Sequence, residues 1–316
     1  MVERMWQMKY HDFIDKRKLN ICTIIPALQD AGFDQKADHI LQCGNRRFFG
    51  VCKECGATHF NGVLACKQRF CAVCQKKRSL LWYMRMFPLF KYYMAKGNKI
   101  VFVTFTVKDT ENLTDGLNYL QDAFRLMIGK GNKITKAFNC LFLGGVRSIE
   151  IKRGANSGLW HPHAHCLFIK RDNNPFKKDF EFLRSVWNDC LCTVHGERAK
   201  WGSVDYKAIK VLNDGCKAIC ECFKYSTKFD WQNNTDDVKE LVESLHRQHL
   251  IVSFGEVRKD LNESSIEHDL ILPYTQLKKQ FCAVCGNDSF DEIYIDARDC
   301  NKLINIYDFM SEDEND

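Results

Sequence analysis

The chain has 316 residues, of which 45% are hydrophobic and 27% are charged, and its net charge is +6. This composition is ordinary for a soluble globular protein with one sizeable domain and a smaller one or two. No apolar run approaches the roughly 18 residues of a membrane span, and the charged first residues lack a signal-peptide core, so we expect a cytoplasmic protein with no membrane partner.

The positive charge is concentrated between Cys43 and Lys99, where 12 Lys and Arg residues accompany a single acid, Glu54. A basic block interleaved with aromatic residues indicates a nucleic-acid partner, although a solvated basic face explains the charge equally well. The acidic stretch 311–316 is expected to be a disordered tail.

Residues 1–42 have apolar positions at helical spacing and carry no evident chemistry. Residues 75–86 follow the same pattern with a basic start, and Pro88 is expected to interrupt or restart that helix. We therefore expect five consecutive segments. They are an N-terminal helical region (1–42), a basic, cysteine-rich region with a linking helix (43–97), a central region that carries the motifs described below (98–260), a C-terminal region (261–310) and an acidic tail (311–316).

Seventeen cysteines are far more than a folded chain needs, and in a reducing compartment clustered cysteines are typical of metal sites rather than disulfides. Cys52 and Cys55 form one Cys-x2-Cys pair, and Cys71 and Cys74 form another 15 residues later. Each pair places two thiolates on one side of a turn, and two such turns can complete a tetrahedron around Zn²⁺. We predict a structural zinc at these four residues, the alternative being buried free cysteines.

A third pair, Cys282 and Cys285, has no partner pair nearby in the sequence. One hypothesis is that Cys43 and Cys66 join it around a second zinc, which would link the two ends of the chain.

Residues 99–107 are β-branched and aromatic, which predicts a strand buried on both faces or nearly so. Residues 112–128 and 176–192 have helical spacing, and residues 143–152 form another strand. A short loop then leads to the strand-like segment 159–169, so these last two strands are expected to pair antiparallel.

His163 and His165 lie two residues apart in this segment and therefore point to the same face of a strand. His161 shares their parity, so alternation alone does not choose the pair that binds a metal. Glu150 on the neighbouring strand is the candidate third ligand, and such a donor set suits Mg²⁺ or Mn²⁺. The alternatives are a histidine-rich strand end without metal and an ordinary surface glutamate.

Residues 214–228 suit a helix on which Glu221, Tyr225 and Lys228 fall on one face. This combination suits phosphoryl transfer, with tyrosine as nucleophile, glutamate as proton acceptor and lysine as electrostatic support. Taken alone, the pattern is better explained by an amphipathic surface helix.

Together these segments resemble the rolling-circle replication initiators of small plasmids and phages, in the HUH endonuclease superfamily, over roughly residues 43–260. The resemblance rests on Phe102–Val107 (first motif), Pro162–His165 (metal motif), Lys224–Lys228 (nucleophile helix), Arg247–Gly255 (trailing strand) and Cys66-x4-Cys71-x2-Cys74 with Arg69 (zinc element). Family usage favours His163 and His165 over His161 as the metal pair.

The resemblance implies an α+β fold, in which a central antiparallel sheet of about five strands is flanked by helices and preceded by a zinc-binding region. It implies a site-specific single-strand DNA endonuclease and strand transferase that forms a 5′-phosphotyrosine at Tyr225 and a free 3′-hydroxyl primer. Mg²⁺ or Mn²⁺ on His163, His165 and Glu150 would assist. Glu221, in place of a second tyrosine, would activate water in the closing step.

The implied partners are a double-stranded origin, its single-stranded or hairpin form, and a host helicase and polymerase. The residues expected to contact DNA phosphates are Arg69, Lys76, Lys77 and Arg78. Two alternatives stay open. A single-strand DNA transposase could have the same core, and a non-catalytic zinc-ribbon regulator would explain the cysteines and the basic block but not the histidine, glutamate and tyrosine pattern.

Overall fold

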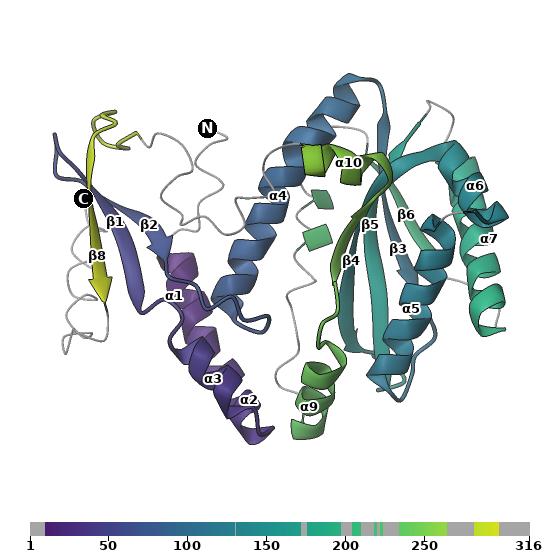
Figure 1. Ribbon diagram of the computed structural model, residues 1–316, viewed down its shortest axis with the longest axis horizontal. Coiled ribbons are helices and arrows are strands. Elements are labelled where there is room, and N and C mark those ends of the chain that lie inside the picture. Colours follow the sequence, from purple (N-terminus) through teal and green to yellow (C-terminus); the bar gives the residue numbers. More distant parts are fainter. Residues whose placement is uncertain are drawn as a thin grey trace. The chain divides into compact units, whose positions relative to one another are not determined.

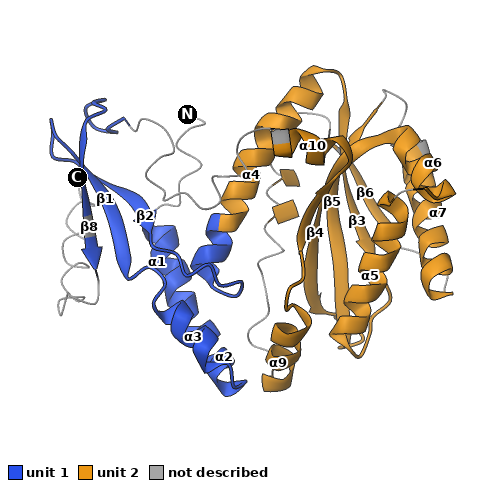
Figure 2. Ribbon diagram, in the orientation of Figure 1, with its two compact units in different colours: residues 1–77, 271–316 blue, residues 78–270 orange. Residues whose placement is uncertain are grey.

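The computed structural model describes residues 10–129, 131–171, 176–196, 204–209, 218–219, 222–223, 234–263 and 281–296. The chain divides into two compact units, residues 1–77 with 271–316 and residues 78–270 (Figure 2). Both ends of the chain belong to the first unit, whereas the sequence analysis treated the C-terminal region as a separate segment.

The first unit combines short helices with a three-stranded antiparallel sheet of order β2-β1-β8 (Figure 1). The helices agree with the expectation for residues 1–42, but the small sheet was not expected. Its elements are α1 (Tyr10–Leu19), the π-helix η2 (Asn20–Ile24), α2 (Ile25–Asp30), α3 (Asp34–Leu41), β1 (Arg46–Cys52), β2 (Thr58–Val63) and β8 (Phe290–Asp296).

The helix α4 (Ala72–Ala95) runs through Pro88, so the expected interruption there is wrong. A proline inside a helix costs about 3 kcal/mol. Its neighbours on the buried side, Met86 and Phe90, are 0% and 1% exposed, and burying two such side chains contributes roughly 3–6 kcal/mol, which outweighs the proline. Neither α4 nor any other helix in the described part of the chain has the length and apolar content that a membrane span requires.

The second unit is built on a five-stranded antiparallel sheet of order β6-β3-β5-β4-β7, with helices packed against it, so the predicted α+β architecture is confirmed (Figure 1). The strand that contains the histidines, β5, lies at the centre of the sheet. The strands are β3 (Lys99–Thr106), β4 (Phe142–Arg153), β5 (Trp160–Lys170), β6 (Val204–Ile209) and β7 (Ile251–Phe254). The helices are α5 (Leu113–Ile128), α6 (Lys133–Leu141), α7 (Phe176–His195), α9 (Thr235–Ser244) and α10 (Gly255–Glu263).

One face of this sheet packs against α5, α6 and α7 and forms the core of the unit (Figure 1). Phe105 lies 4.7 Å from the ring of Trp187 on α7, and Phe168 lies 5.3 Å from the ring of Phe138 on α6, as centroid distances. The strand β3 was expected to be buried on both faces, but its burial alternates, because every second residue lines an open pocket on the other face. The core thus fixes the strands whose opposite face carries the histidines.

Candidate metal centres

A pocket of about 380 Å³ opens on the sheet face opposite α5, α6 and α7. Strand pairing places Glu150 of β4 directly opposite His163 of β5, and Thr104 of β3 opposite His165. Side chains of one parity on three adjacent strands therefore converge on one place. The residues that line the pocket are Phe102, Thr104, Thr106, Glu150, Lys152, His161, His163, His165 and Asp205.

Glu150, His163 and His165 present their ligand atoms within 4.8 Å of one another. The Nε2 atoms of both histidines face Oε2 of Glu150, at 3.1 Å for His165 and in a short contact for His163. Two imidazole nitrogens and a carboxylate oxygen are donors that divalent transition metals and Mn²⁺ accept, so these three residues can hold a metal. The structure brings together the three residues selected from the sequence.

The outer nitrogens of the two rings are also engaged, which fixes how the rings point. Nδ1–H of His163 donates to the carbonyl oxygen of His161 at 3.4 Å, and Nδ1 of His165 is hydrogen-bonded to the hydroxyl group of Thr104 at 3.1 Å. A carbonyl oxygen can only accept, so Nδ1 of His163 carries a proton, and Nε2 is the ring atom that faces Glu150 and the pocket. A bound metal would take the place of the proton that Nε2 shares with Glu150. Such outer partners are typical of metal-binding histidines.

The charge on Glu150 is consistent with this arrangement. Burial by itself would raise the pKa of its carboxyl group, but hydrogen bonds from His163 and His165 lower the pKa to about 2. The residue is therefore an ionised carboxylate at neutral pH, which is the form that binds a cation.

His161 has a different partner, although it lines the same pocket. Its Nδ1 lies 2.6 Å from Oδ1 of Asp109, and Asp109 also accepts a hydrogen bond from Oγ of Ser157. His163 and His165 thus share Glu150, whereas His161 pairs with Asp109, and these contacts favour the first two histidines as the metal pair.

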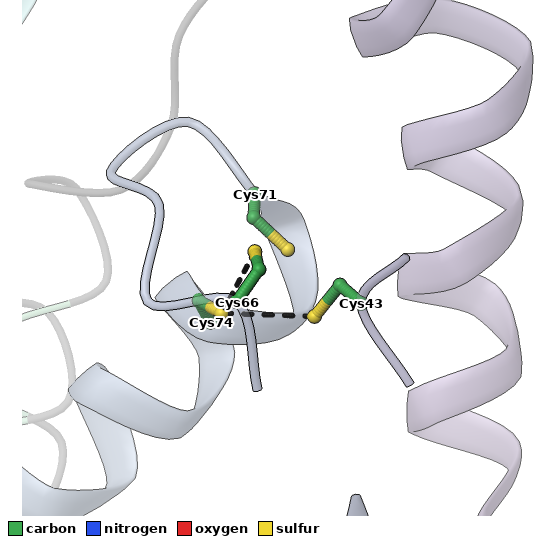
Figure 3. Close-up of side chains that lie close together, drawn as sticks. All are labelled: Cys43, Cys66, Cys71 and Cys74. Carbon is green, nitrogen blue, oxygen red and sulfur yellow. Dashed lines mark hydrogen bonds between the residues drawn. The ribbon is translucent and has the colours of Figure 1, made fainter. Parts of the chain in front are cut away.

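Four cysteines of the first unit gather at the start of α4. The sulfur of Cys74 lies 3.7 Å from that of Cys43 and 3.6 Å from that of Cys66, and Cys71 completes the group (Figure 3). Four thiols at this spacing suit a tetrahedral Zn²⁺ site.

The other group consists of Cys52, Cys55, Cys282 and Cys285. The two groups contain the eight cysteines predicted as zinc ligands, but the predicted division of these cysteines between the two sites is wrong. The pair 52/55 does not share a site with the pair 71/74; it faces the pair 282/285 instead, because β8 pairs with β1 and brings the distant pair beside the turn that follows β1.

Asn20 supports the group at the start of α4. Its Nδ2–H donates to the sulfur of Cys71 at 3.3 Å, and its Oδ1 accepts the backbone N–H of Ala72 at 2.8 Å. Asn20 is 1% exposed and lies in the π-helix, a distortion that is frequent at functional sites. The side-chain amide of Asn20 therefore stabilises the turn that contains Cys71 through both of its polar atoms.

The three proposed catalytic residues, Glu221, Tyr225 and Lys228, lie outside the described residues. Their described neighbours are Cys222, which donates its S–H to the carbonyl oxygen of His165 at 3.4 Å, and Phe223. The ring of Phe223 stacks on Trp82 of α4 at 5.5 Å, and its carbonyl oxygen accepts a hydrogen bond from Ser79 at 3.0 Å. Residues 222 and 223 thus contact both α4 and the histidine strand.

The four basic residues proposed to contact DNA, Arg69, Lys76, Lys77 and Arg78, are all half-buried. Lys76 lies 4.0 Å from Asp12, and burial lowers the pKa of Lys77. None of this tests contact with DNA, which stays a prediction.

Three residues with clear roles in these geometries were not singled out from the sequence: Asn20, Thr104 and Asp109. Thr104 belongs to a motif that was noticed, and strand alternation places it on one face with Phe102 and Thr106. Only the register between β3 and β5 shows that it meets His165. Asn20 and Asp109 lie far along the chain from their partners and leave no local signal.

A family model described as "Replication protein" (Rep_1) matches residues 57–281. The chain belongs to this replication protein family. It is similar to "Protein rep" of Streptococcus pneumoniae serotype 2, at 24% identity over 274 residues that cover 81% of this chain and 82% of the relative. It is also similar to "Protein rep" of a Bacillus species, at 26% identity over 263 residues that cover 74% and 83%. No solved structure matches. Membership of this family implies that the protein binds DNA.

Proposed function

We propose that the protein initiates rolling-circle replication of a small plasmid as a metal-dependent HUH-type nickase and ligase. The observation that carries the proposal is the convergence of Glu150, His163 and His165 in an open pocket on the central strands of the sheet. Membership of a replication protein family adds the substrate class, DNA.

A divalent ion at this site, Mg²⁺ or Mn²⁺, would supply positive charge to the non-bridging oxygens of a phosphodiester. The residues of the chain bind the ion and orient its ligands. Glu150 and the two histidines hold the ion, Thr104 and the His161 carbonyl keep the rings oriented, and Lys228 adds charge beside the phosphate.

Tyr225 is the proposed nucleophile. Its hydroxyl oxygen forms a bond to phosphorus while the bond from phosphorus to the 3′ oxygen breaks, and the phenolic proton is lost as the 3′ oxygen gains one. The products are a 5′-phosphotyrosine and a free 3′-hydroxyl that primes a polymerase. Glu221 then activates water in the closing step.

The described neighbours of the proposed catalytic residues support this assignment. Cys222 contacts the backbone of His165 on the strand that carries the metal ligands. Phe223 stacks on Trp82 of α4.

The test is covalent attachment to DNA. Wild-type protein incubated with single-stranded origin DNA and Mn²⁺ should give a protein–DNA adduct on a denaturing gel. Tyr225→Phe should give none while duplex binding survives. Tyr92→Phe, which changes an exposed tyrosine of α4, should give the normal yield and serves as control. A normal adduct from Tyr225→Phe would refute the assignment.

Glu221 is tested separately from the nucleophile. Glu221→Ala should nick and form the adduct at a normal rate but release product slowly, since water activation is the step it is assigned. Unchanged multiple-turnover release would exclude that role.

The cysteine group at the start of α4 fits the same function. We assign a structural Zn²⁺ to Cys43, Cys66, Cys71 and Cys74, where it would fix the basic first turns of α4. Lys76, Lys77, Arg78 and the preceding Arg69 would then contact DNA phosphates as a group.

A further inference from the structure

The turns at Cys52–Gly56 and Cys282–Gly286 have the same backbone design. In the first, the N–H of Gly56 donates to the carbonyl of Cys52 at 2.9 Å, and in the second the N–H of Gly286 donates to the carbonyl of Cys282 at 2.9 Å. Both glycines have positive φ, 73° and 79°, which L side chains rarely adopt. Each turn projects two sulfurs toward the other turn.

The sulfur distances fit a metal and not a disulfide. Cys52 and Cys285 lie 3.5 Å apart, and Cys55 and Cys282 lie 3.4 Å apart. Four sulfurs at about 2.3 Å from a tetrahedral Zn²⁺ lie about 3.8 Å from one another, whereas a disulfide requires about 2.05 Å.

Cys282 also receives the hydrogen bonds expected of a metal-bound thiolate. The backbone N–H of Val284 donates to its sulfur at 3.4 Å, and Nε2 of His59 lies 3.4 Å from the same sulfur. Because four thiolates leave a zinc site with net negative charge, N–H donors at the sulfurs stabilise it.

The segment that carries the second turn has almost no core of its own. Within 281–296, Cys282 and Asp296 are the buried residues among those whose burial is described, while Phe281 and Val284 are 65% and 74% exposed. The strand β8 is held on β1 by backbone hydrogen bonds and by the Arg46–Asp296 ion pair at 3.0 Å. Apolar contacts add little. A strand with so little apolar burial is marginal in water without a covalent or metal staple.

We propose that Cys52, Cys55, Cys282 and Cys285 bind a second Zn²⁺, independent of the one at the start of α4, and that this ion holds β8 on β1. The proposal goes beyond the proposed nicking function, because strand transfer at Tyr225 does not need these cysteines.

The first test counts zinc by mass spectrometry in purified full-length protein. His163 and His165 are replaced by alanine throughout, so that the pocket on the large sheet cannot contribute. Two zinc ions per chain are expected, and one after Cys282→Ser with Cys285→Ser. Control substitutions at the exposed Cys22 and Cys140 should leave two. One ion in the parent, or two in the double variant, would overturn the proposal.

The second test asks whether the ion holds β8, by hydrogen exchange with natural His163 and His165. Amides of 290–296 should be protected in the zinc-loaded protein and lose that protection in the double variant. If the double variant does not fold, removal of zinc from the natural protein with a chelator replaces it. Amides of β3 and β5 should stay protected in both states. Unchanged protection of β8 after loss of the ion would contradict the proposed role. Neither test depends on adduct formation, so failure here and failure of the nuclease proposal are distinguishable.

Discussion

Thr104→Val tests how the histidine rings are held in the pocket. The substitution keeps the β-branched shape of the side chain but removes the hydroxyl group that is hydrogen-bonded to Nδ1 of His165 at 3.1 Å. His165 is 9% exposed, and leaving a buried hydrogen bond unmade costs about 1–3 kcal/mol. At 1.4 kcal/mol per tenfold change, this corresponds to a loss of roughly 5–150-fold, in line with the 10–100-fold typical of outer partners of metal ligands.

The expected result is therefore about a 10–100-fold weaker affinity for Mn²⁺. Free Mn²⁺ measured by electron paramagnetic resonance during titration of the zinc-loaded protein gives that affinity directly. Circular dichroism establishes that the sheet remains folded.

Thr106→Val is the matched control. Thr106 lies opposite His163 in the same pocket, but His163 donates its Nδ1–H to a main-chain carbonyl, which the substitution leaves in place. Its Mn²⁺ affinity should stay near that of wild type. Wild-type affinity in Thr104→Val would refute the reasoning, and equal losses in both variants would point to a general change in the pocket.

Three further predictions concern stability, zinc and DNA. Asp179→Ala removes the carboxylate 2.7 Å from the fully buried ammonium of Lys170 and should lower the free energy of unfolding by about 3–5 kcal/mol in urea denaturation, with Lys170→Met as second substitution restoring most of it. Asn20→Ala removes the N–H donor to Cys71 and should weaken zinc retention at the start of α4 by roughly 10-fold in a chelator competition; retention equal to wild type would exclude the supporting role. Arg78→Ala should weaken binding of all DNA sequences alike and reduce the slope of log affinity against log salt by about 1, and a sequence-selective loss would contradict a phosphate contact.

The grouping of Glu150, His163 and His165 was largely predictable, because it depends on two local rules. Strand alternation placed His163 and His165 on one face, and the short loop before the histidine strand implied an antiparallel neighbour. Those two inferences make Glu150 a candidate neighbour of the histidines, and the register that places it directly opposite His163 comes from the structure.

The division of the cysteines was not predictable in the same way. Spacing identifies each Cys-x2-Cys turn, since both sulfurs depend on the same few residues. Which two turns share an ion depends on the pairing of β1 with β8, whose ends are separated by 250 residues in the Arg46–Asp296 contact. Neither strand has the regular apolar alternation that would have revealed this pairing, and β8 buries little apolar surface.

The turns at Cys52–Gly56 and Cys282–Gly286 are far apart along the chain, and this separation has a consequence for biosynthesis. Cys55 meets Cys282 across 227 residues, so at about 5–20 residues per second the ribosome needs roughly 11–45 s to supply the second turn after the first. During that interval the thiols of the first turn are accessible to oxidants and to competing metals. The order of synthesis thus makes the small sheet of this protein one of the last parts to mature, well after its helices have emerged.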